Sequence, residues 1–453
     1  MIVKQCSLTI YFSNGSSLPI VYSPDFNDGT NVCTHISIKE SAMSAGKNPV
    51  GVVSSNSLSL TLKSRDGSLF PENSSSPYYG MMNASARIGI SVTDDDGVVS
   101  FGTFFVESWV PQLTSSTPYT VKIVALDKLS LFGRNPVPIA GKMIPISSDS
   151  YFRSVITAVN SKLSLPYRII VPDGTLFNKF PNLSVSDLGT DKMNEWLNIF
   201  AQSTLTNIYL TRNSTLLTDY VLDSPSESPL FTLSDTTNVT SVSLNSSSNT
   251  AYTGVQVSGV SYSVNNNSEQ LLSLSDLTLN QGITTLSGLL FETSGVYKIT
   301  NVVIESSLSS TSDITLTNLT YNSSGLSLSI NNSSSSNTQV NLKVFGLLTS
   351  KSKIIYSSGD TSVMGSVFEC TNSILPQSYL NSYSSDLLSV INTKSETLTL
   401  SGLFNMRMTV GSLVTVSLTG SLKLSGVYKI VSLDWSIAST IKCTAVLQKV
   451  VRE

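Results

Sequence analysis

Three carboxylate residues lie in or beside strand-like runs of this chain and could carry acid–base chemistry: Glu107, Asp127 and Asp434. A glycosidase needs two carboxylates that flank the scissile bond, at a separation that a sequence does not reveal. The competing interpretation is that these side chains form salt bridges or face solvent at strand ends. We favour the second interpretation and keep a glycosidase as the third hypothesis for function.

Nucleophilic catalysis has little support in the residue pattern. His35 is the only histidine, so it alone could serve a Ser-His-Asp triad, and no Gly-x-Ser-x-Gly elbow supplies a nucleophile. One histidine also excludes a three-histidine zinc site. The run Ser44-Ala45-Gly46-Lys47 matches the Ser-x-x-Lys pair of penicillin-recognising enzymes, but the companion Ser-Asp-Asn and Lys-Thr-Gly motifs are absent. We interpret His35 as an ordinary strand or loop residue and the Ser-x-x-Lys match as chance.

An acidic run, Asp94-Asp95-Asp96-Gly97, offers the oxygen ligands that Ca²⁺ prefers. It lies between two strand-like runs, where Asp-Gly also forms tight hairpin turns. We favour the acidic turn. No P-loop and no dinucleotide-binding glycine motif occurs. The sequence therefore predicts no catalytic, cofactor-binding or metal-binding residue, no cofactor and no enzymatic activity.

Charge is scarce in this chain. Hydrophobic residues form 40% of the 453 residues, whereas charged residues form 13%, against roughly 25% in typical domains. The net charge is −3 and no long basic run occurs, so we expect no nucleic-acid binding. A surface rich in Ser, Thr and Asn suits a protein packed in a large assembly, because few charges lose their hydration there.

The four cysteines predict neither a zinc site nor a disulfide framework, because they are scattered without a Cys-x-x-Cys pair. We expect buried thiols in a reducing cytosol at Cys6, Cys33, Cys370 and Cys443. The amino terminus has no signal-peptide core, and no apolar run approaches the ~20 residues of a membrane helix. We therefore expect no membrane insertion.

Period-2 alternation predicts an antiparallel β-barrel or sandwich over residues 1–145. Alternating apolar runs are separated by Asp-Gly turns, which tolerate positive φ. The runs are 57–62, 88–92 and 121–125, and the turns are at Asp28, Asp66 and Asp96.

Helical periodicity marks a small α/β domain over residues 146–222. Apolar residues recur at helical spacing from 148 to 163, and a second helix is predicted to start at Thr190 and to bury Trp196. A strand is expected at 168–171, and a hairpin from Ile208 to Leu217 closes the segment.

The third segment, 223–350, is predicted to be a β-sandwich or barrel. Its first part, 223–250, is so rich in Ser, Thr and Asn that we expect a loop or an extended surface segment. Strands are expected around 316–319, 326–330 and 340–344, with a polar tip at 331–337. The fourth segment, 351–453, should contain a helix at 377–391 and end in four strands.

One six-residue phrase occurs twice. Ser294-Gly295-Val296-Tyr297-Lys298-Ile299 and Ser425-Gly426-Val427-Tyr428-Lys429-Ile430 each combine a glycine turn with an alternating strand. The repeat favours two related β units stacked in one assembly. Shared turn chemistry is the alternative.

The order of these blocks resembles that of tailed-bacteriophage baseplate or tail-hub proteins, whose structural region also occurs in tail-associated lysins. The first barrel is similar in its order of strand phrases. These phrases are NPVGVVSSNSLSLTL at 48–62, SPYYG at 76–80, GTFFV at 102–106 with Trp109, and VKIVALD at 121–127. The helix at 149–163, the helix around Trp196 and the following hairpin resemble the small α/β domain of hub proteins. The helix near 377–391 and the runs 411–416 and 425–430 resemble the end of the family, which usually has Gly-Asp where this chain has Gly411-Ser412.

The resemblance implies a fold, an oligomeric assembly and a location in the virion. The fold would be mainly β with a small α/β domain and barrels of the tail-hub type. Hub proteins often contain two similar barrels, which let a trimer mimic sixfold symmetry. We thus expect a homotrimeric ring that ends the tail tube of a virion, contacts the tube or distal tail protein, and offers a platform for fibres or a spike after synthesis in the host cytoplasm. The alternative is a phage receptor-binding protein or adhesin that recognises cell-surface glycans.

Overall fold

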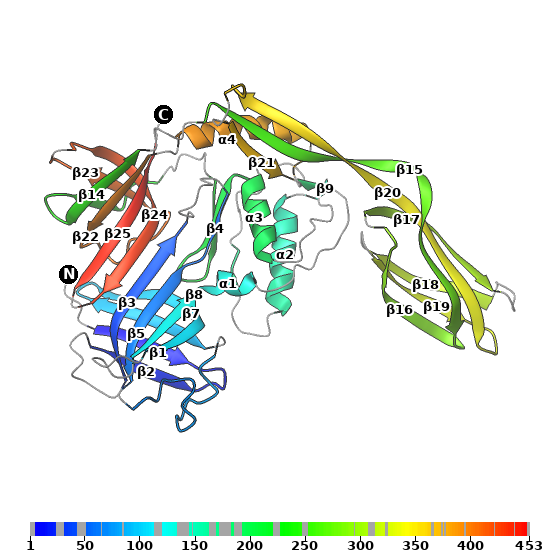
Figure 1. The fold of residues 1–453 in the computed structure, drawn as a ribbon, viewed down its shortest axis with the longest axis horizontal. Coiled ribbons are helices and arrows are strands. Elements are labelled where there is room, and N and C mark those ends of the chain that lie inside the picture. Colours follow the sequence, from blue (N-terminus) through cyan, green and yellow to red (C-terminus); the bar gives the residue numbers. More distant parts are fainter. Residues whose placement is uncertain are drawn as a thin grey trace.

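The computed structural model describes residues 5–23, 31–42, 51–64, 66–83, 86–112, 120–133, 145–146, 148–162, 169–171, 183–184, 193–220, 227–246, 252–293, 295–306, 313–321, 325–363, 367–372, 375, 377–393, 396–420, 422–438 and 440–450. Figure 1 shows two neighbouring β-structures, a helical region and a long two-stranded arm that ends in a further β module. The predicted class, mainly β with a small α/β part, is confirmed. Among the described helices, none has the length and apolar character needed to span a membrane.

The first β-structure, called barrel 1 here, is a closed barrel of seven strands. Its strands follow one another by hydrogen bonding until β5 pairs with β3 and closes the ring. The alternation expected from the sequence appears as alternating buried and half-buried positions in β5 and β6. One pairing departs from the antiparallel prediction, because β2 and β3 run parallel. In ring order the strands are β3 (Asn31–Ser41), β2 (Ser17–Tyr22), β1 (Gln5–Tyr11), β6 (Arg87–Asp94), β7 (Gly97–Gln112), β8 (Thr120–Leu126) and β5 (Ser57–Ser64).

The second β-structure, called barrel 2, consists of six strands that curve in one sheet. In order they are β13 (Phe231–Ser234), β23 (Leu413–Ser417), β24 (Ser425–Ile437), β25 (Ile441–Lys449), β22 (Glu396–Gly402) and β14 (Val239–Ser246). Of the two expectations for 223–250, a loop or an extended surface segment, the loop is therefore wrong at β13 and β14. Their backbones pair with β23 and β22, and neutral polar side chains suit strands whose outer face meets water.

The two barrels share a strand. The first half of β24 pairs with β23, and residues 432–437 of β24 pair with residues 36–41 of β3. The apolar side chains of both barrels form one continuous core that includes Ile38, Phe104, Leu433 and Trp435. Barrels joined by backbone hydrogen bonds and a common core are expected to behave as one rigid body.

The α/β region contains the two predicted helices, as α2 (Ser148–Lys162) and α3 (Met193–Ser203). A short α1 (Lys128–Phe132) precedes them. The predicted hairpin is confirmed as β11 (Thr206–Leu210) and β12 (Leu216–Tyr220), and β11 also pairs with β4 (Val53–Ser54).

The predicted strand at 168–171 is wrong within the described residues, where Ile170 makes a single bridge to Thr215. A short pair, β9 (Pro145–Ile146) and β10 (Leu183–Ser184), completes this region.

The arm is a hairpin of two long strands, β15 (Gly254–Leu279) and β20 (Thr338–Gly359). Near the barrels, β21 (Val367–Asn372) pairs with β15, and α4 (Gln377–Thr393), the third predicted helix, packs on the hairpin. Gly259 allows the close approach, because a Cβ there would lie 2.3 Å from Cδ1 of Leu380, whose side chain would have to shift. This near part of the arm shares its core with the α/β region.

The far end of the arm carries what we call the distal module. Here β17 (Val296–Ser306) joins the hairpin, and a second sheet contains β16 (Gly282–Leu290), β19 (Gly325–Asn332) and β18 (Ile314–Tyr321). The strands predicted around 316–319, 326–330 and 340–344 are confirmed in β18, β19 and β20. The module has a core of its own, which includes Leu271, Leu328 and Leu342.

The repeated phrase does not mark two stacked units. Its first copy leads into β17 in the distal module, and its second begins β24 in barrel 2, in a different sheet. The two copies also orient differently: Tyr297 is 42% exposed, whereas Tyr428 is 4% exposed. Shared turn chemistry, with a positive φ at Gly295, is the better interpretation of the repeat.

The division into 1–145, 146–222, 223–350 and 351–453 stays a prediction. The pairing of β13 and β14 with β23 and β22 ties the start of the third segment to the fourth.

Candidate functional site

The three candidate carboxylates have separate roles. Asp127 is buried and caps α1: one carboxylate oxygen accepts a hydrogen bond from Leu129 N at 3.0 Å, and the other from Asn56 N at 2.8 Å. Burial raises the pKa of Asp127 to about 7. Glu107 and Asp434 are exposed on β7 and β24, which are not neighbours in the described sheet. The structure does not join these carboxylates into an acid–base pair.

The other candidate residues fit structural roles. His35 is exposed in β3, beside an irregularity in the pairing with β5. The run Ser44-Ala45-Gly46-Lys47 lies outside the described residues. Asp94 is buried in the β6–β7 turn, and Arg407 donates two hydrogen bonds to its carboxylate, at 2.7 and 3.0 Å. The Arg407 hydrogen bonds hold the pKa of Asp94 below its ordinary value. These contacts agree with an acidic turn, and over the described part of the chain no three His, Cys, Asp or Glu side chains gather as metal ligands would.

One buried polar cluster of the described chain was not selected by the sequence analysis. We call it the junction, and it consists of Glu40, Phe101, Arg212 and Trp435 with the backbone of residues 406–408. Glu40 lies near the end of β3, Phe101 lies in β7, Arg212 lies in the β11–β12 turn and Trp435 lies in β24. The cluster thus joins both barrels and the α/β region at one point.

Arg212 is the centre of the junction. Its Nε and Nη2 atoms donate to the two oxygens of Glu40, at 2.7 and 2.6 Å. Its Nη1 donates to the carbonyl of Met406 at 2.6 Å, and Nη2 also donates to the carbonyl of Met408 at 2.9 Å. The side chains of Arg212 and Glu40 are only 9% and 7% exposed. A buried charge needs such complete pairing, because it has lost its hydration.

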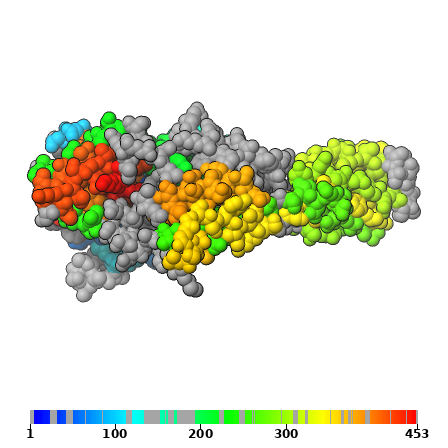
Figure 2. Space-filling view, turned by 90° about the horizontal axis from the view of Figure 1, so that it is seen from above, coloured from blue at the N-terminus to red at the C-terminus, as the bar shows by residue number. Residues whose placement is uncertain are grey.

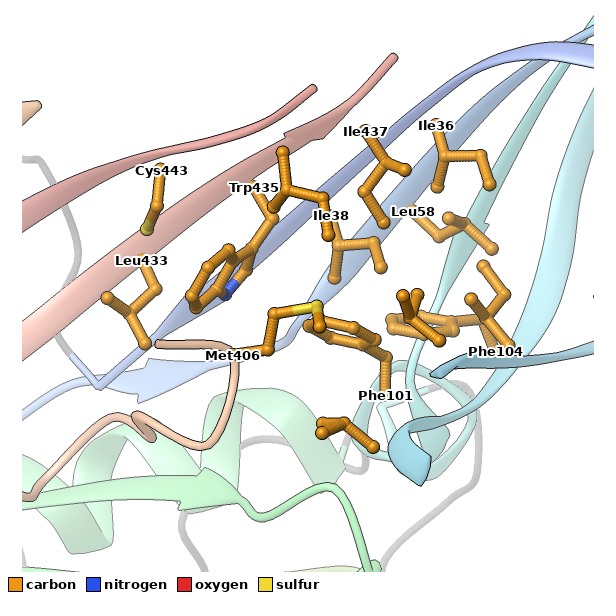
Figure 3. Packing of buried hydrophobic residues seen from close by; sticks show 14 of the residues in the cluster. Ile36, Ile38, Leu58, Phe101, Phe104, Met406, Leu433, Trp435, Ile437 and Cys443 are labelled. Atoms are coloured by element: carbon orange, nitrogen blue, oxygen red, sulfur yellow. The ribbon is translucent and has the colours of Figure 1, made fainter. Parts of the chain in front are cut away.

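Aromatic side chains close the junction from the barrel interior. The guanidinium of Arg212 lies 4.4 Å from the ring centre of Phe101, a cation–π arrangement. Phe101 meets Trp435 edge to face at 5.9 Å, and Trp435 Nε1 donates to Glu40 at 3.0 Å. Figure 3 shows Phe101, Met406 and Trp435 directed toward one another among the isoleucines of β3 and β24. The guanidinium of Arg212, the carboxylate of Glu40 and the indole N–H of Trp435 therefore all have partners inside the protein.

Glycine allows the turn that carries Arg212 to reach barrel 1. Gly102 has a φ of +92°, and a Cβ there would lie 2.7 Å from the carbonyl oxygen of Arg212. Any side chain at this position would push the turn outward.

Two further contacts tie the α/β region to the barrels. Lys429 in β24 forms an ion pair with Asp219 in β12. On the side of barrel 1, Asn56 donates to the carbonyl of Leu210 at 3.0 Å and accepts a hydrogen bond from Ser41 N at 3.2 Å. The junction is thus flanked by polar contacts that hold the same three parts together. Its arrangement mechanically couples the two barrels and the α/β region.

One signal for the junction was present in the sequence. Alternation along 36–40 puts Glu40 on the face of Ile36 and Ile38, which is buried. A charged residue in a core position needs a partner, which points to a buried ion pair. Nothing in the sequence pattern indicates Arg212 as that partner, because it lies in a turn 172 residues away.

No protein-family model and no curated protein matches this chain. Solved structures, by contrast, do match this chain. The tail protein from Neisseria meningitidis MC58 is similar over 98% of this chain and 96% of its own, with 9% identity and a TM-score of 0.51. The 43 kDa tail protein of prophage MuSo2 from Shewanella oneidensis is similar over 98% of this chain and 97% of its own, with 9% identity and a TM-score of 0.52. The chain has the fold of phage tail proteins.

The resemblance predicted from block order is therefore confirmed at the level of the fold, over nearly the full length. A weaker similarity, with 10% identity and a TM-score of 0.45, relates 99% of this chain to 58% of a chain in a Francisella PdpA–VgrG complex. A TM-score of this size does not establish a common fold.

Proposed function

We propose that this chain is a non-enzymatic structural protein of a bacteriophage tail, and that it acts as the hub that ends the tail tube. Three copies would form a ring in the tail tip or baseplate. One face of the ring would contact the tube or a distal tail protein, and the other would carry fibres or a spike.

The observation that carries this proposal is the joining of the two barrels. They share the β3–β24 ladder and one core, and the junction fixes them against the α/β region. Two joined barrels in each of three copies would place six β-structures around an axis. A ring closes head-to-tail contacts of this kind into a finite assembly.

The composition agrees with a protein that buries much of its surface against neighbouring subunits. Charged residues are 13% of the chain, so a neighbouring copy can cover a wide surface while few charges lose their hydration. The polar groups of the junction are satisfied internally, which leaves the outer surface for contacts between subunits.

The test is the mass of the purified chain in solution, measured by light scattering, with negative-stain images of the same sample. A trimeric mass and a ring with a central opening support the hub. A chain that stays monomeric both alone and with purified tail tube would contradict it.

A receptor-binding protein or adhesin remains the second candidate, and one observation favours it. The distal module projects from the barrels (Figure 1), and its strands β16, β18 and β19 contain no charged residue. The outer hydroxyl groups of Thr285 and Ser329 lie 3.0 Å apart, on neighbouring strands. Such a neutral hydroxyl-bearing face suits neutral glycans. Binding to a glycan array by the monomer, with no ring formation, would favour the adhesin over the hub.

A further inference from the structure

The arm has a stretch, called the neck here, in which only two strands run side by side. It consists of residues 260–267 of β15 and 349–353 of β20. On the barrel side, β21 stops pairing with β15 at Gly259. On the far side, β17 begins its pairing with β20 at Leu348. Among the described strands, none other pairs with the neck. Outside the hairpin, Thr349 N at one end donates to the carbonyl of Gly295 at 3.0 Å, and Ser261 Oγ at the other end donates to Gln377 of α4 at 3.2 Å. An isolated two-stranded ribbon is marginally stable in water.

The described side chains of the neck form no core. None of its side chains that the structure describes is buried, and Val264 is 39% exposed. The core of the α/β region reaches Val257 on β15, and the core of the distal module begins at Leu271. Few buried contacts and solvent-exposed backbone hydrogen bonds are the features of segments that deform at low free energy.

The pairing is irregular at the same place. Val264 pairs with Thr349, and the next partners are Ser268 and Leu347. Three residues of β15, Asn265, Asn266 and Asn267, thus face the single residue Leu348 of β20. This gives β15 two residues more than its partner. A bulge interrupts the ladder and lets the strands bend.

By contrast, the parts on either side are well packed. The distal module has two sheets of three strands each around its own core. On the barrel side, α4 covers the hairpin, and Tyr383 of α4 donates to the carbonyl of Gln202 at 2.7 Å. Figure 2 shows the distal module set apart from the rest at one end of the long axis.

From these observations we propose that the neck is a hinge, and that the distal module swings about it as a rigid body relative to the barrels. The extra residues of β15 absorb the bending, while the cores on either side keep their packing. The module can therefore change its direction with no change in the junction.

The test uses the full chain with two spin labels and a measured distribution of distances between them. One pair joins barrel 1 to the module, through Lys39→Cys and Thr278→Cys. The control pair lies within the module, through Thr278→Cys and Thr315→Cys. All three positions are exposed. Labelled chains are diluted with unlabelled chain, so that only distances within one copy contribute.

The native cysteines permit this labelling. Cys6, Cys33 and Cys443 are buried, and burial raises the pKa of the Cys6 thiol to about 12. The half-buried Cys370, whose pKa burial raises to about 11, is replaced by serine in every sample. Protonated, buried thiols react slowly at neutral pH.

With a hinge, the distribution of distances between the barrel and module labels should be at least roughly twofold wider than the distribution for the control pair. Removal of Asn266 and Asn267 makes the ladder continuous and keeps the same faces, since two residues preserve the alternation. This deletion should narrow the barrel–module distribution toward the control, whereas Asn266→Ser with Asn267→Ser should leave it wide.

Two results would overturn the hinge: a parent distribution as narrow as the control, or a width that the deletion leaves unchanged while the control pair keeps its distance. Should the deletion variant fail to fold, insertion of two serines after Asn267 provides the second variant. It must widen the barrel–module distribution and leave the control as it was.

Discussion

Arg212 places its guanidinium against the carboxylate of Glu40, 172 residues earlier in the chain, with N–O distances of 2.7 and 2.6 Å. Both side chains are almost fully buried, and their remaining polar contacts reach barrel 2 through Met406, Met408 and Trp435. The ion pair therefore fixes the relative position of three parts of the molecule.

Replacement of Arg212 by alanine should lower the free energy of unfolding by about 3–5 kcal/mol, because Glu40 stays buried without its partner. The measurement is urea unfolding followed by tryptophan fluorescence, since Trp435 reports on the junction. The control is Lys343→Ala, which breaks the exposed ion pair with Glu305 and should lower stability by at most about 1 kcal/mol. Equal effects of the two variants would show that the junction does not stabilise the barrels.

Replacement of Gly102 by alanine should destabilise the protein more than replacement of Gly97. Both glycines have a positive φ, +92° and +119°, but a Cβ meets the carbonyl of Arg212 only at Gly102, and at Gly97 the space is open. We expect a loss of about 1 kcal/mol for Gly97→Ala from the backbone conformation and about 2–4 kcal/mol for Gly102→Ala. Thermal unfolding of both variants isolates the contribution of the close approach. A smaller effect at Gly102 would mean that the β11–β12 turn can move away freely.

Asp127 should make stability fall as the pH rises. Its pKa in the folded protein is about 7, above the ordinary 3.8, so the folded state holds the proton more tightly than the unfolded state. The stabilisation is fully present below pH 4 and is lost as the pH rises toward 7, by about 2–4 kcal/mol. Asp127→Asn keeps a capping oxygen and removes the titration. Unfolding curves at pH 4.5 to 8 should therefore slope differently for parent and variant, and parallel profiles would refute the assignment.

Asp94 should give the opposite pH dependence. The Arg407 hydrogen bonds lower its pKa, so its stabilisation is present above the ordinary pKa of 3.8 and is lost as the pH falls below it. Asp94→Asn should reduce stability by about 1–2 kcal/mol at neutral pH, with a difference from the parent that shrinks under acid conditions. A difference that persists at pH 3 would indicate that shape, and not charge, decides the effect. The same pH series as for Asp127 provides this comparison.

Local patterns were sufficient to predict much of the fold. Alternation at 57–62 and 88–92 predicted β5 and β6, and apolar residues at helical spacing predicted α2 and α4. The strands β13 and β14 were missed, because Ser, Thr and Asn are typical of loops and the partners of these strands lie at least 150 residues away.

The junction was harder to predict than the fold. The burial of Glu40 follows from the alternation of β3, but its partner Arg212 stands in a turn whose local sequence gives no such indication. The pairing depends on how the β11–β12 hairpin docks on the barrels, and local periodicity contains no information on that docking.

The position of β24 has a consequence for synthesis on the ribosome. The strands of barrel 1 are complete once residue 126 has emerged, whereas residues 36–41 of β3 must wait for residues 432–437. During that interval one edge of β3 lacks its β24 partner, while its other edge pairs with β5, and the open edge can pair with another nascent strand. This edge of β3 is therefore covered only after synthesis has passed β24 and the β3–β24 ladder has formed.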